Sequence, residues 1–365
     1  MKIGIVGLPN VGKSTLFNAL TKGGAEAANY PFCTIEPNVG IVAVPDDRLG
    51  ALADISGSKK IIPTTIEFVD IAGLVAGASR GEGLGNLFLS HIRSVDAIAH
   101  VVRCFADDNI THVHGGLDPV SDARTINLEL ILADLELVEK KLETEGRKAK
   151  SGDKQAKVRL SGLQKLQQSL EQEQPARHCK LTPEEKTLLR RDCQFLTDKK
   201  VIYVANVDEA DLPDGDDNSY VSSLRSYALS QGDQLVCVSA RVEAELAELD
   251  EDESAIFLQE LGIEQSGFKR LINAAYSLLD LISFLTTGKI ETRAWTIRRG
   301  TLAPQAAAVI HTDFEKHFIR AEVVPFDDLI SAGSWNGARQ QGKLRTEGKN
   351  YVLGDGEVTH FLTSA

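Results

Sequence analysis

A short glycine-bounded segment near the start of the chain has the residue types that bind phosphate. Residues 7–15 read Gly-Leu-Pro-Asn-Val-Gly-Lys-Ser-Thr, which matches the P-loop pattern G-x-x-x-x-G-K-S/T in full. The glycines let successive backbone N–H groups point at phosphate oxygens, and a following helix would add its positive N-terminal end. Lys13 would reach the outer phosphates, and the Ser14 hydroxyl would bind Mg²⁺. The segment therefore predicts a site for a nucleoside triphosphate.

Three further residues have the chemistry to complete such a site. Asp70 ends the apolar run 65–70, so its carboxylate would contact the Mg²⁺ through a water molecule. Gly73 closes the string D-x-x-G, and its backbone N–H would bind the terminal phosphate. Thr34 lies in a loop before the next expected strand, and its hydroxyl would complete the Mg²⁺ shell only while a γ-phosphate holds that loop. Thr34 is therefore expected to act as a switch element.

Two later segments carry residues that could recognise the base. Asn206 and Val207 stand at the end of the apolar run 201–207, and Glu209 lies two residues after it. Ser239 stands at the end of the next apolar run. GTPases that select guanine use N-K-x-D, in which the aspartate accepts from two guanine N–H groups. In this chain Glu209 replaces the aspartate and Val207 the lysine, and the longer acidic side chain would misplace the acceptor oxygens. We therefore expect guanine preference to be lost and adenine to be tolerated or preferred.

The position that orients the attacking water in many GTPases is unsuited to that role here. A glutamine often follows D-x-x-G, and Leu74 stands at that position. A leucine side chain neither donates nor accepts a hydrogen bond. Another group must therefore orient the water if this chain hydrolyses its nucleotide.

Alternating strand-like and helix-like patterns must position these residues. They predict a parallel sheet covered by helices on both faces, which is an α/β fold. Six short apolar runs predict its strands: 3–6, 40–44, 65–70, 97–103, 201–207 and 234–239. From about residue 280 the pattern changes to one short helix among several short strands, which predicts a small α+β domain.

The long interruption of the sheet, 125–197, is predicted to be helical. From Leu128 to Leu142, apolar residues recur at spacings of three and four residues and form one apolar stripe of a helix. A second apolar stripe follows a break at 151–153. Two or three antiparallel helices projecting from the sheet would fit this pattern. Residues 140–165 hold nine basic and three acidic residues, so the arm is either a solvated hairpin or a contact for RNA phosphate.

Composition limits the class of protein. The formal net charge of −12 argues against a general nucleic-acid coat, and residues 243–253, with seven acids, are expected to form a solvated face. The five cysteines have neither metal-ligand nor CxxC spacing, so reduced thiols in a cytosol are expected. No apolar run approaches the roughly 20 residues of a membrane span, so we expect no membrane partner.

Seven motifs together resemble one family over essentially the whole chain. They are the P-loop, N-Y-P-F-C-T-I-E-P-N, F-V-D-I-A-G-L-V, G-A-S-R-G-E-G-L-G-N, N-V-D-E, R-A-W-T and H-T-D-F-E-K-H-F-I-R-A-E-V. This set resembles the YchF/Obg-like ATPase family, in the Obg group of P-loop proteins related to translation factors. The resemblance implies an ATP hydrolase that prefers ATP to GTP, depends on Mg²⁺ and associates with the large or small ribosomal subunit. We also expect slow intrinsic turnover and a cytoplasmic location.

The resemblance also implies a division into three domains. Residues 1–124 and 198–279 would form a discontinuous nucleotide-binding domain, interrupted by the helical arm at 125–197. Residues 280–365 would form a TGS domain of the β-grasp type. RNA contacts through the arm and the TGS domain are an open alternative to contacts with ribosomal protein.

The resemblance assigns roles to particular positions of this sequence. The nucleotide contacts would fall on Asn10, Val11, Gly12, Lys13, Ser14 and Thr15, and the base contact on Val207, beside Asn206 and Glu209. Asn10 would also support a K⁺ ion near the phosphates. That ion could stabilise the negative charge of the transition state, as an arginine finger does. The catalytic histidine would be His112, with His114 as a further candidate, because a neutral imidazole near pH 7 can handle a water proton.

Three functions remain open at this point. The first is an ATP hydrolase that works as a ribosome-associated switch. The second is an ordinary GTPase in which Glu209 is tolerated, and the third is an ATP-gated binding module in which hydrolysis is incidental. Glu209 disfavours the second function. Leu74 cannot orient the attacking water, so the sequence does not separate the first function from the third.

Overall fold

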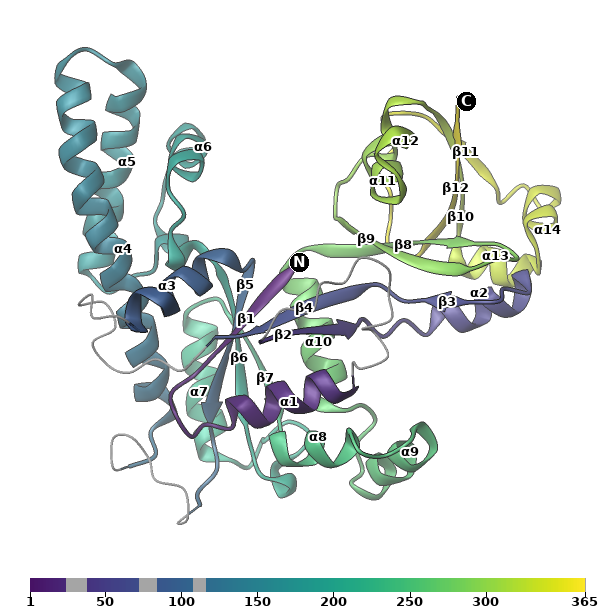
Figure 1. Cartoon of the computed structure of the whole chain (residues 1–365), viewed down its shortest axis with the longest axis horizontal. Coiled ribbons are helices and arrows are strands. Elements are labelled where there is room, and N and C mark those ends of the chain that lie inside the picture. Colours follow the sequence, from purple (N-terminus) through teal and green to yellow (C-terminus); the bar gives the residue numbers. More distant parts are fainter. Residues whose placement is uncertain (24–37, 72–83, 108–115, 365) are drawn as a thin grey trace. The chain divides into compact units, whose positions relative to one another are not determined.

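The computed structural model describes residues 1–23, 38–71, 84–107 and 116–364. Within these ranges the chain divides into two compact units, which are described separately (Figure 1). The first unit contains Met1–Ile41 and Glu67–Leu271, and the second contains Val42–Ile66 and Ile272–Ala365. In the described part of the chain, no helix has the length and apolarity needed to cross a membrane.

A six-stranded sheet forms the centre of the first unit. Its strands, in spatial order, are β2 (Val39–Ala43), β4 (Thr65–Asp70), β1 (Lys2–Val6), β5 (Ala97–Arg103), β6 (Lys200–Asn206) and β7 (Gln234–Val238). β1 pairs in parallel with β4 and β5, and β6 pairs in parallel with β5 and β7. Every residue of β5 is buried, as expected for a central strand with both faces covered. The carboxyl ends of the parallel strands therefore meet at one edge of the sheet.

The six strands predicted from apolar runs are all present within one residue of their expected ends. The helices of this unit outside the arm are α1 (Lys13–Gly23), α3 (Leu84–Ser94), α7 (Ser219–Ser230), α8 (Ala240–Leu246) and α9 (Glu251–Glu260). α10 (Gly267–Leu278) begins in this unit, and its residues from Ile272 onward belong to the second unit. Short 3₁₀ turns lie at Ala176–His178, Leu196–Asp198 and Glu209–Asp211. The predicted strand–loop–helix order around the P-loop is thereby confirmed.

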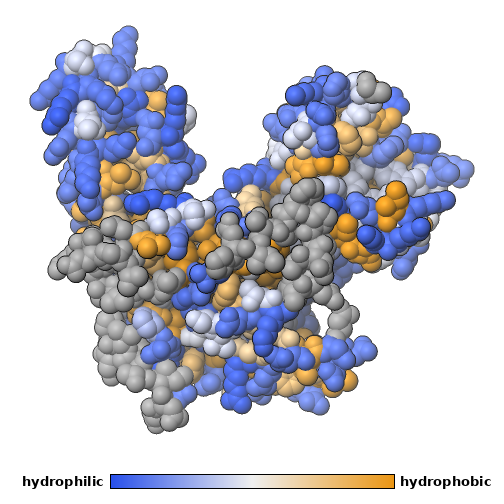
Figure 2. Space-filling view, in the orientation of Figure 1, coloured by the Kyte–Doolittle hydropathy of each residue, from blue (hydrophilic) through white to orange (hydrophobic). Residues whose placement is uncertain are grey.

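The arm consists of α4 (Pro119–Lys150), α5 (Lys154–Glu171) and α6 (Pro183–Asp192), and α4 and α5 lie side by side (Figure 1). Leu163, Leu166 and Leu170 of α5 are buried in its apolar core. Gly162 allows α6 to approach closely, because a Cβ at that position would lie 2.7 Å from Leu189 Cδ1. Figure 2 shows hydrophilic side chains over most of the outer surface of the arm.

A buried carboxylate fixes the base of the arm. Asp134 of α4 accepts hydrogen bonds from Leu196 N and Thr197 N, each at 2.8 Å, and from Thr197 Oγ1 at 2.7 Å. Burial raises the pKa of Asp134, whereas these three donors lower it. The bonds tie α4 to the turn that leads into β6, so the arm is joined to the sheet by directional contacts as well as by the chain.

A second six-stranded sheet forms the centre of the second unit. Its strands, in spatial order, are β11 (Arg345–Glu347), β10 (Phe318–Pro325), β12 (Glu357–Thr363), β8 (Leu281–Thr287), β9 (Thr292–Arg298) and β3 (Ile61–Ile62). β12 and β8 are parallel, while β8–β9, β10–β12 and β10–β11 are antiparallel. The helices are α2 (Arg48–Ser56), α11 (Ala303–Ile310), α12 (Thr312–Lys316), α13 (Phe326–Ala332) and α14 (Trp335–Gln340).

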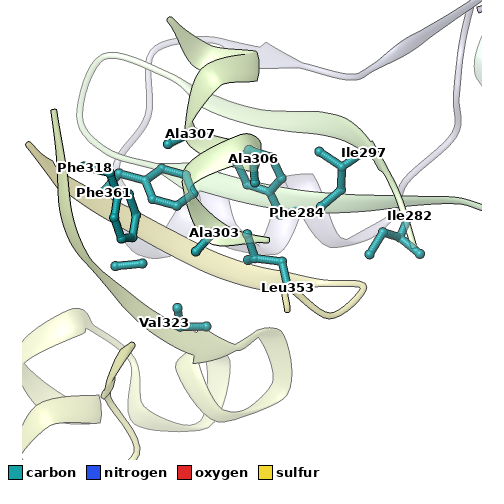
Figure 3. Close-up of a cluster of buried hydrophobic side chains, with 11 residues drawn as sticks. Ile282, Phe284, Ile297, Ala303, Ala306, Ala307, Phe318, Val323, Leu353 and Phe361 are labelled. Carbon is teal, nitrogen blue, oxygen red and sulfur yellow. The ribbon is translucent and has the colours of Figure 1, made fainter. Parts of the chain in front are cut away.

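Both faces of this second sheet bury apolar side chains. On one face, three alanines of α11 pack with Phe284, Phe318 and Phe361 (Figure 3). On the other face, Leu49 and Leu52 of α2 pack with residues of β8, β10 and α13. Residues 42–66 therefore cluster with the second unit, although they precede it by more than 200 positions in the sequence. The three-domain division inferred from the family resemblance stays a prediction.

Candidate functional site

The loop between β1 and α1 is shaped by two glycines that have no space for a side chain. A Cβ on Gly7 would lie 2.7 Å from the carbonyl oxygen of Val101 in β5. Gly12 has a φ of 89°, and a Cβ there would lie 2.3 Å from Asn206 Nδ2. Both glycines of the P-loop pattern are therefore required by close approach to neighbouring strands, and Gly12 also by its backbone conformation.

Lys13 and Asp70 lie together at the edge where the parallel strands end. Lys13 is the first residue of α1 and is only 9% exposed. Asp70 is the last residue of β4 and pairs in register with Ile5 of β1. Lys13 Nζ contacts Asp70 Oδ1, so a buried ammonium faces a carboxylate. The sheet thus brings together two residues that the sequence places 57 positions apart.

Asn206 connects the phosphate-binding loop with the opposite side of the site. Its side chain is buried, with 3% exposed. Asn206 Nδ2 donates to the carbonyl oxygen of Val11 at 2.9 Å, and its Oδ1 accepts from Ala240 N at 3.0 Å. One amide therefore holds the loop, the end of β6 and the start of α8 in a fixed arrangement. The sequence indicated only that Asn206 lies near the base, and this double anchoring depends on strand order.

The other expected base-recognition residues surround Asn206. Ser239 is buried and caps α8, where its hydroxyl accepts from Val242 N at 3.5 Å. The side chain of Val207 is also buried, and the backbone N–H of Val207 donates to the carbonyl oxygen of Val238 at 3.0 Å. Glu209 is exposed at the start of a 3₁₀ turn. The strand ends thus gather these residues at one place, with the Glu209 carboxylate open to solvent.

The remaining predicted site residues differ in what the structure describes. Asn10, Ser14 and Thr15 are exposed on the loop and the first turn of α1, and Asn10 has a φ of 64°. Thr34, Gly73 and His112 lie outside the described residues, as do Leu74 and His114. Of the predicted metal ligands, the structure therefore describes Ser14 and Asp70 for Mg²⁺ and Asn10 for K⁺.

One buried carboxyl group beside the site was not anticipated. Glu243 lies in α8, three residues after Ala240, and is only 3% exposed. It accepts a hydrogen bond of 2.6 Å from the N–H of Gly267, the first residue of α10. Burial raises the pKa of Glu243 to about 7, although Gly267 N–H, Phe268 N–H and the charge of Arg270 lower it. The expectation of a solvated face is wrong for Glu243, because no sequence pattern separates it from its acidic neighbours.

The fold and the site define the class of protein. A parallel sheet whose first strand leads through a glycine-bounded loop into a helix, with an aspartate at the end of the adjacent strand, defines a P-loop nucleoside triphosphatase. The family model for the 50S ribosome-binding GTPase matches residues 2–135. A second model, for the C-terminal part of YchF GTPases and described as "Protein of unknown function (DUF933)", matches residues 281–364.

Relatives with similar sequences span almost the entire chain. The Ribosome-binding ATPase YchF of Bacillus subtilis is 55% identical over 358 residues, which cover 98% of this chain and 98% of the relative. The protein of the same name from Escherichia coli O157:H7 is 54% identical over 362 residues, with 99% and 98% covered. The solved structure of the Schizosaccharomyces pombe YchF GTPase superimposes with a TM-score of 0.89 at 41% identity and covers 99% of this chain and 97% of that one.

The chain belongs to the YchF family. The resemblance noted from seven motifs is thereby confirmed. The predicted fold class is also confirmed: an α/β P-loop sheet, a long helical arm and a C-terminal domain.

Replacing Asn206 tests its role as the anchor of the loop. Asn206→Ala removes the hydrogen bonds to Val11 and Ala240, so the loop should lose part of its preorganisation. We expect the affinities for ATP and GTP to fall by the same factor, about tenfold, as measured by calorimetric titration. Asn18→Ala, at an exposed position of α1, is the matched control. A loss confined to one nucleotide would instead indicate that Asn206 acts on the base.

Glu243 should make stability depend on pH. Its pKa rises from 4.5 in the unfolded chain to about 7 in the fold, so the folded state holds the proton more tightly. The resulting stabilisation is fully present below pH 4.5 and is lost as pH rises to about 7, by roughly 3 kcal/mol. Urea unfolding between pH 5 and 8 should show this fall in the native chain. Glu243→Gln should flatten the profile and the exposed control Glu260→Gln should not; parallel profiles for all three proteins would contradict the assignment.

Proposed function

We propose that this protein is a ribosome-associated ATPase whose bound nucleotide controls its docking on the ribosome. The observation that carries the proposal is the anchored loop, in which Asn206 holds Val11 while Lys13 and Asp70 face each other at its mouth. The relatives named above support the rest, because their names describe ribosome-binding ATPases. A ribosome partner, large or small subunit, would put this activity in the cytoplasm.

Mg²⁺ fits the residues at the mouth of the loop. Ser14 presents an exposed hydroxyl on the first turn of α1, and Asp70 presents a carboxylate on the neighbouring strand. Among the described residues, no group of three or more His, Cys, Asp or Glu is arranged to hold a metal ion. The proposed site needs none, because one hydroxyl, one carboxylate acting through water, and phosphate oxygens supply its ligands. When bound, Mg²⁺ would neutralise charge on the terminal phosphates.

The chain's own groups would bind and orient the triphosphate. Lys13 would exchange its contact with Asp70 for the outer phosphate oxygens, while the loop N–H groups bind the others. We extend the proposal to Thr34, Gly73 and His112 on sequence grounds, as a switch hydroxyl, a phosphate N–H donor and the group that orients water. Asn10, exposed on the same loop, is the proposed site for K⁺.

The residues around the base support adenine over guanine. Guanine selection requires a carboxylate held close to the two ring-edge N–H groups. Here Glu209 is one methylene longer than aspartate and is exposed at the start of its turn, while the neighbouring Val207 is buried and apolar. Neither residue therefore supplies the fixed pair of acceptors that guanine needs. This observation disfavours the ordinary GTPase alternative.

The arm supports an RNA contact less strongly than its composition indicated. Lys148 and Arg159 both contact the buried carboxylate of Glu145, each at 2.7 Å, and Lys165 contacts Glu185 at 2.8 Å. Lys140 pairs with Glu136. Four of the nine basic side chains thus contact carboxylates of the arm itself, so we propose ribosomal RNA as a partner of the arm only through the remaining exposed ones.

Comparing the two nucleotides tests the base preference. We expect ATP to bind at least tenfold more tightly than GTP, about 1.4 kcal/mol, in equilibrium titrations with Mg²⁺. Glu209→Asp should narrow that ratio, because the shorter side chain restores the guanine acceptor position. Glu245→Asp, at an exposed position of α8, should leave the ratio unchanged. Guanine binding tenfold tighter than adenine in the native chain would overturn the proposal.

Ribosome-stimulated hydrolysis separates the ATPase from a binding module. Added ribosomes should raise phosphate release from ATP, because a partner that orders the site increases turnover. His112→Ala should lower the rate by about 10²–10⁴-fold, the usual contribution of a positioned acid–base group, without weakening ATP binding. His91→Ala is the matched control, because His91 is an exposed residue of α3. If ribosomes and His112→Ala both leave the rate unchanged, the binding module is the remaining function.

A further inference from the structure

The second unit contains an opening between two strands of its sheet. Near their first residues, β8 and β12 are held together: Gly356 N donates to Ser283 O at 2.8 Å, and Ser283 N donates to Asp355 Oδ1 at 2.9 Å. Leu285 and Val358 form the single registered pair between the two strands, both of which are fully described. Beyond that pair, β8 remains paired with β9, and β12 remains paired with β10. The sheet is therefore closed at one end and opens toward Thr287 and Thr363.

A cavity of about 600 Å³ lies at this opening. Thr286 of β8 and Thr359 and Phe361 of β12 line it from the two separating strands. Phe314 of α12 and Trp335 of α14 add two further aromatic side chains. The ten lining residues comprise three aromatic side chains, one isoleucine and six polar or charged side chains, and the volume lies in the range of small-molecule sites. All lining residues belong to the second unit, so this cavity is separate from the P-loop.

A buried hydroxyl in the cavity wall lacks a hydrogen-bond partner. Thr359 is only 2% exposed, and its Oγ1 makes no hydrogen bond with any described residue. Leaving a buried polar group unsatisfied costs about 1–3 kcal/mol, so such groups usually have a specific cause. Across the opening, Thr286 Oγ1 accepts from Trp295 Nε1 at 2.9 Å and still has its own proton to donate. The two hydroxyls thus offer hydrogen bonds to the edge of a molecule held between the strands.

The charges at the rim of the cavity compensate one another. Arg339 Nη2 donates to Glu322 Oε1 at 3.2 Å, and His360 Nδ1 lies 3.7 Å from Glu322 Oε2. The carboxylate is already satisfied, so the rim does not attract a cation. The guanidinium is also paired, so the rim is poorly suited to a polyphosphate. The rim therefore favours a ligand that is neutral or carries a single charge.

We propose that this cavity binds a small, fused heteroaromatic molecule. Its ring would pack against Phe314, Trp335 and Phe361, and its polar edge would hydrogen-bond to Thr359 and Thr286. Binding would give the buried Thr359 hydroxyl the hydrogen-bond partner that it lacks. This proposal does not depend on the proposed ATPase function.

The two tryptophans of the chain provide a direct readout. Both lie in the second unit: Trp335 lines the cavity, and Trp295 hydrogen-bonds to Thr286. Tryptophan fluorescence of the full-length protein is titrated with adenine, hypoxanthine, indazole and quinazoline, with saturating ADP present to occupy the P-loop. We expect saturable quenching by at least one of these probes below about 1 mM, and none by cyclohexanol, which is neither flat nor aromatic.

A pair of threonine variants decides whether the response comes from the cavity. Thr359→Val keeps the side-chain shape but removes the hydroxyl, and should weaken binding of the responsive probe at least fivefold. Since it removes an unsatisfied buried hydroxyl, its unfolding temperature should equal or exceed that of the native chain. Thr346→Val, at an exposed position of β11, should leave binding unchanged. The proposal is overturned if none of the four probes gives a saturable response, or if Thr359→Val binds the responsive probe as tightly as the native chain.

Discussion

Asn206 donates one hydrogen bond to the phosphate-binding loop and accepts another from the start of α8, and the rest of the nucleotide site depends on that buried amide. A loop of backbone N–H groups binds an anion well only if the groups already point in the required directions. Gly12 has no room for a Cβ because Asn206 occupies the adjacent space. The loop, the end of β6 and the start of α8 therefore form one interlocked structure.

Two buried carboxylates extend this arrangement from the site into the unit. Glu243 binds the first N–H of α10, three residues beyond the α8 turn that Asn206 holds. Asp134 binds two backbone N–H groups and a hydroxyl where the arm meets β6. Each carboxylate satisfies groups at a helix or turn terminus that would otherwise be buried without partners. Hydrogen bonds of this kind fix where the arm ends and where α10 begins.

The sequence predicted the strands around the site well, because each is a short apolar run and buried parallel strands require such runs. It also predicted that the backbone turns tightly at Gly7 and Gly12, since the motif encodes backbone conformation locally, whereas the role of Lys13 toward phosphate stays a prediction. It did not predict that residues 42–66 pack with the second unit, because Leu49 and Leu52 look like any apolar helix face until their partners are known. Glu243 was misjudged for the same reason: burial is decided by what packs over a residue.

The sequence by itself determined the class of protein, the phosphate-binding loop and the elements that flank it, since those features rest on local spacing and hydrophobic period. Only the tertiary structure decided which distant residues meet there: Asp70 with Lys13, Asn206 with Val11, and Glu243 with Gly267. It also decided that β8 and β12 separate beyond Leu285 and Val358 to leave a cavity. The physical reason is that strand order and register bring together residues far apart along the chain, and neither is encoded in any short segment.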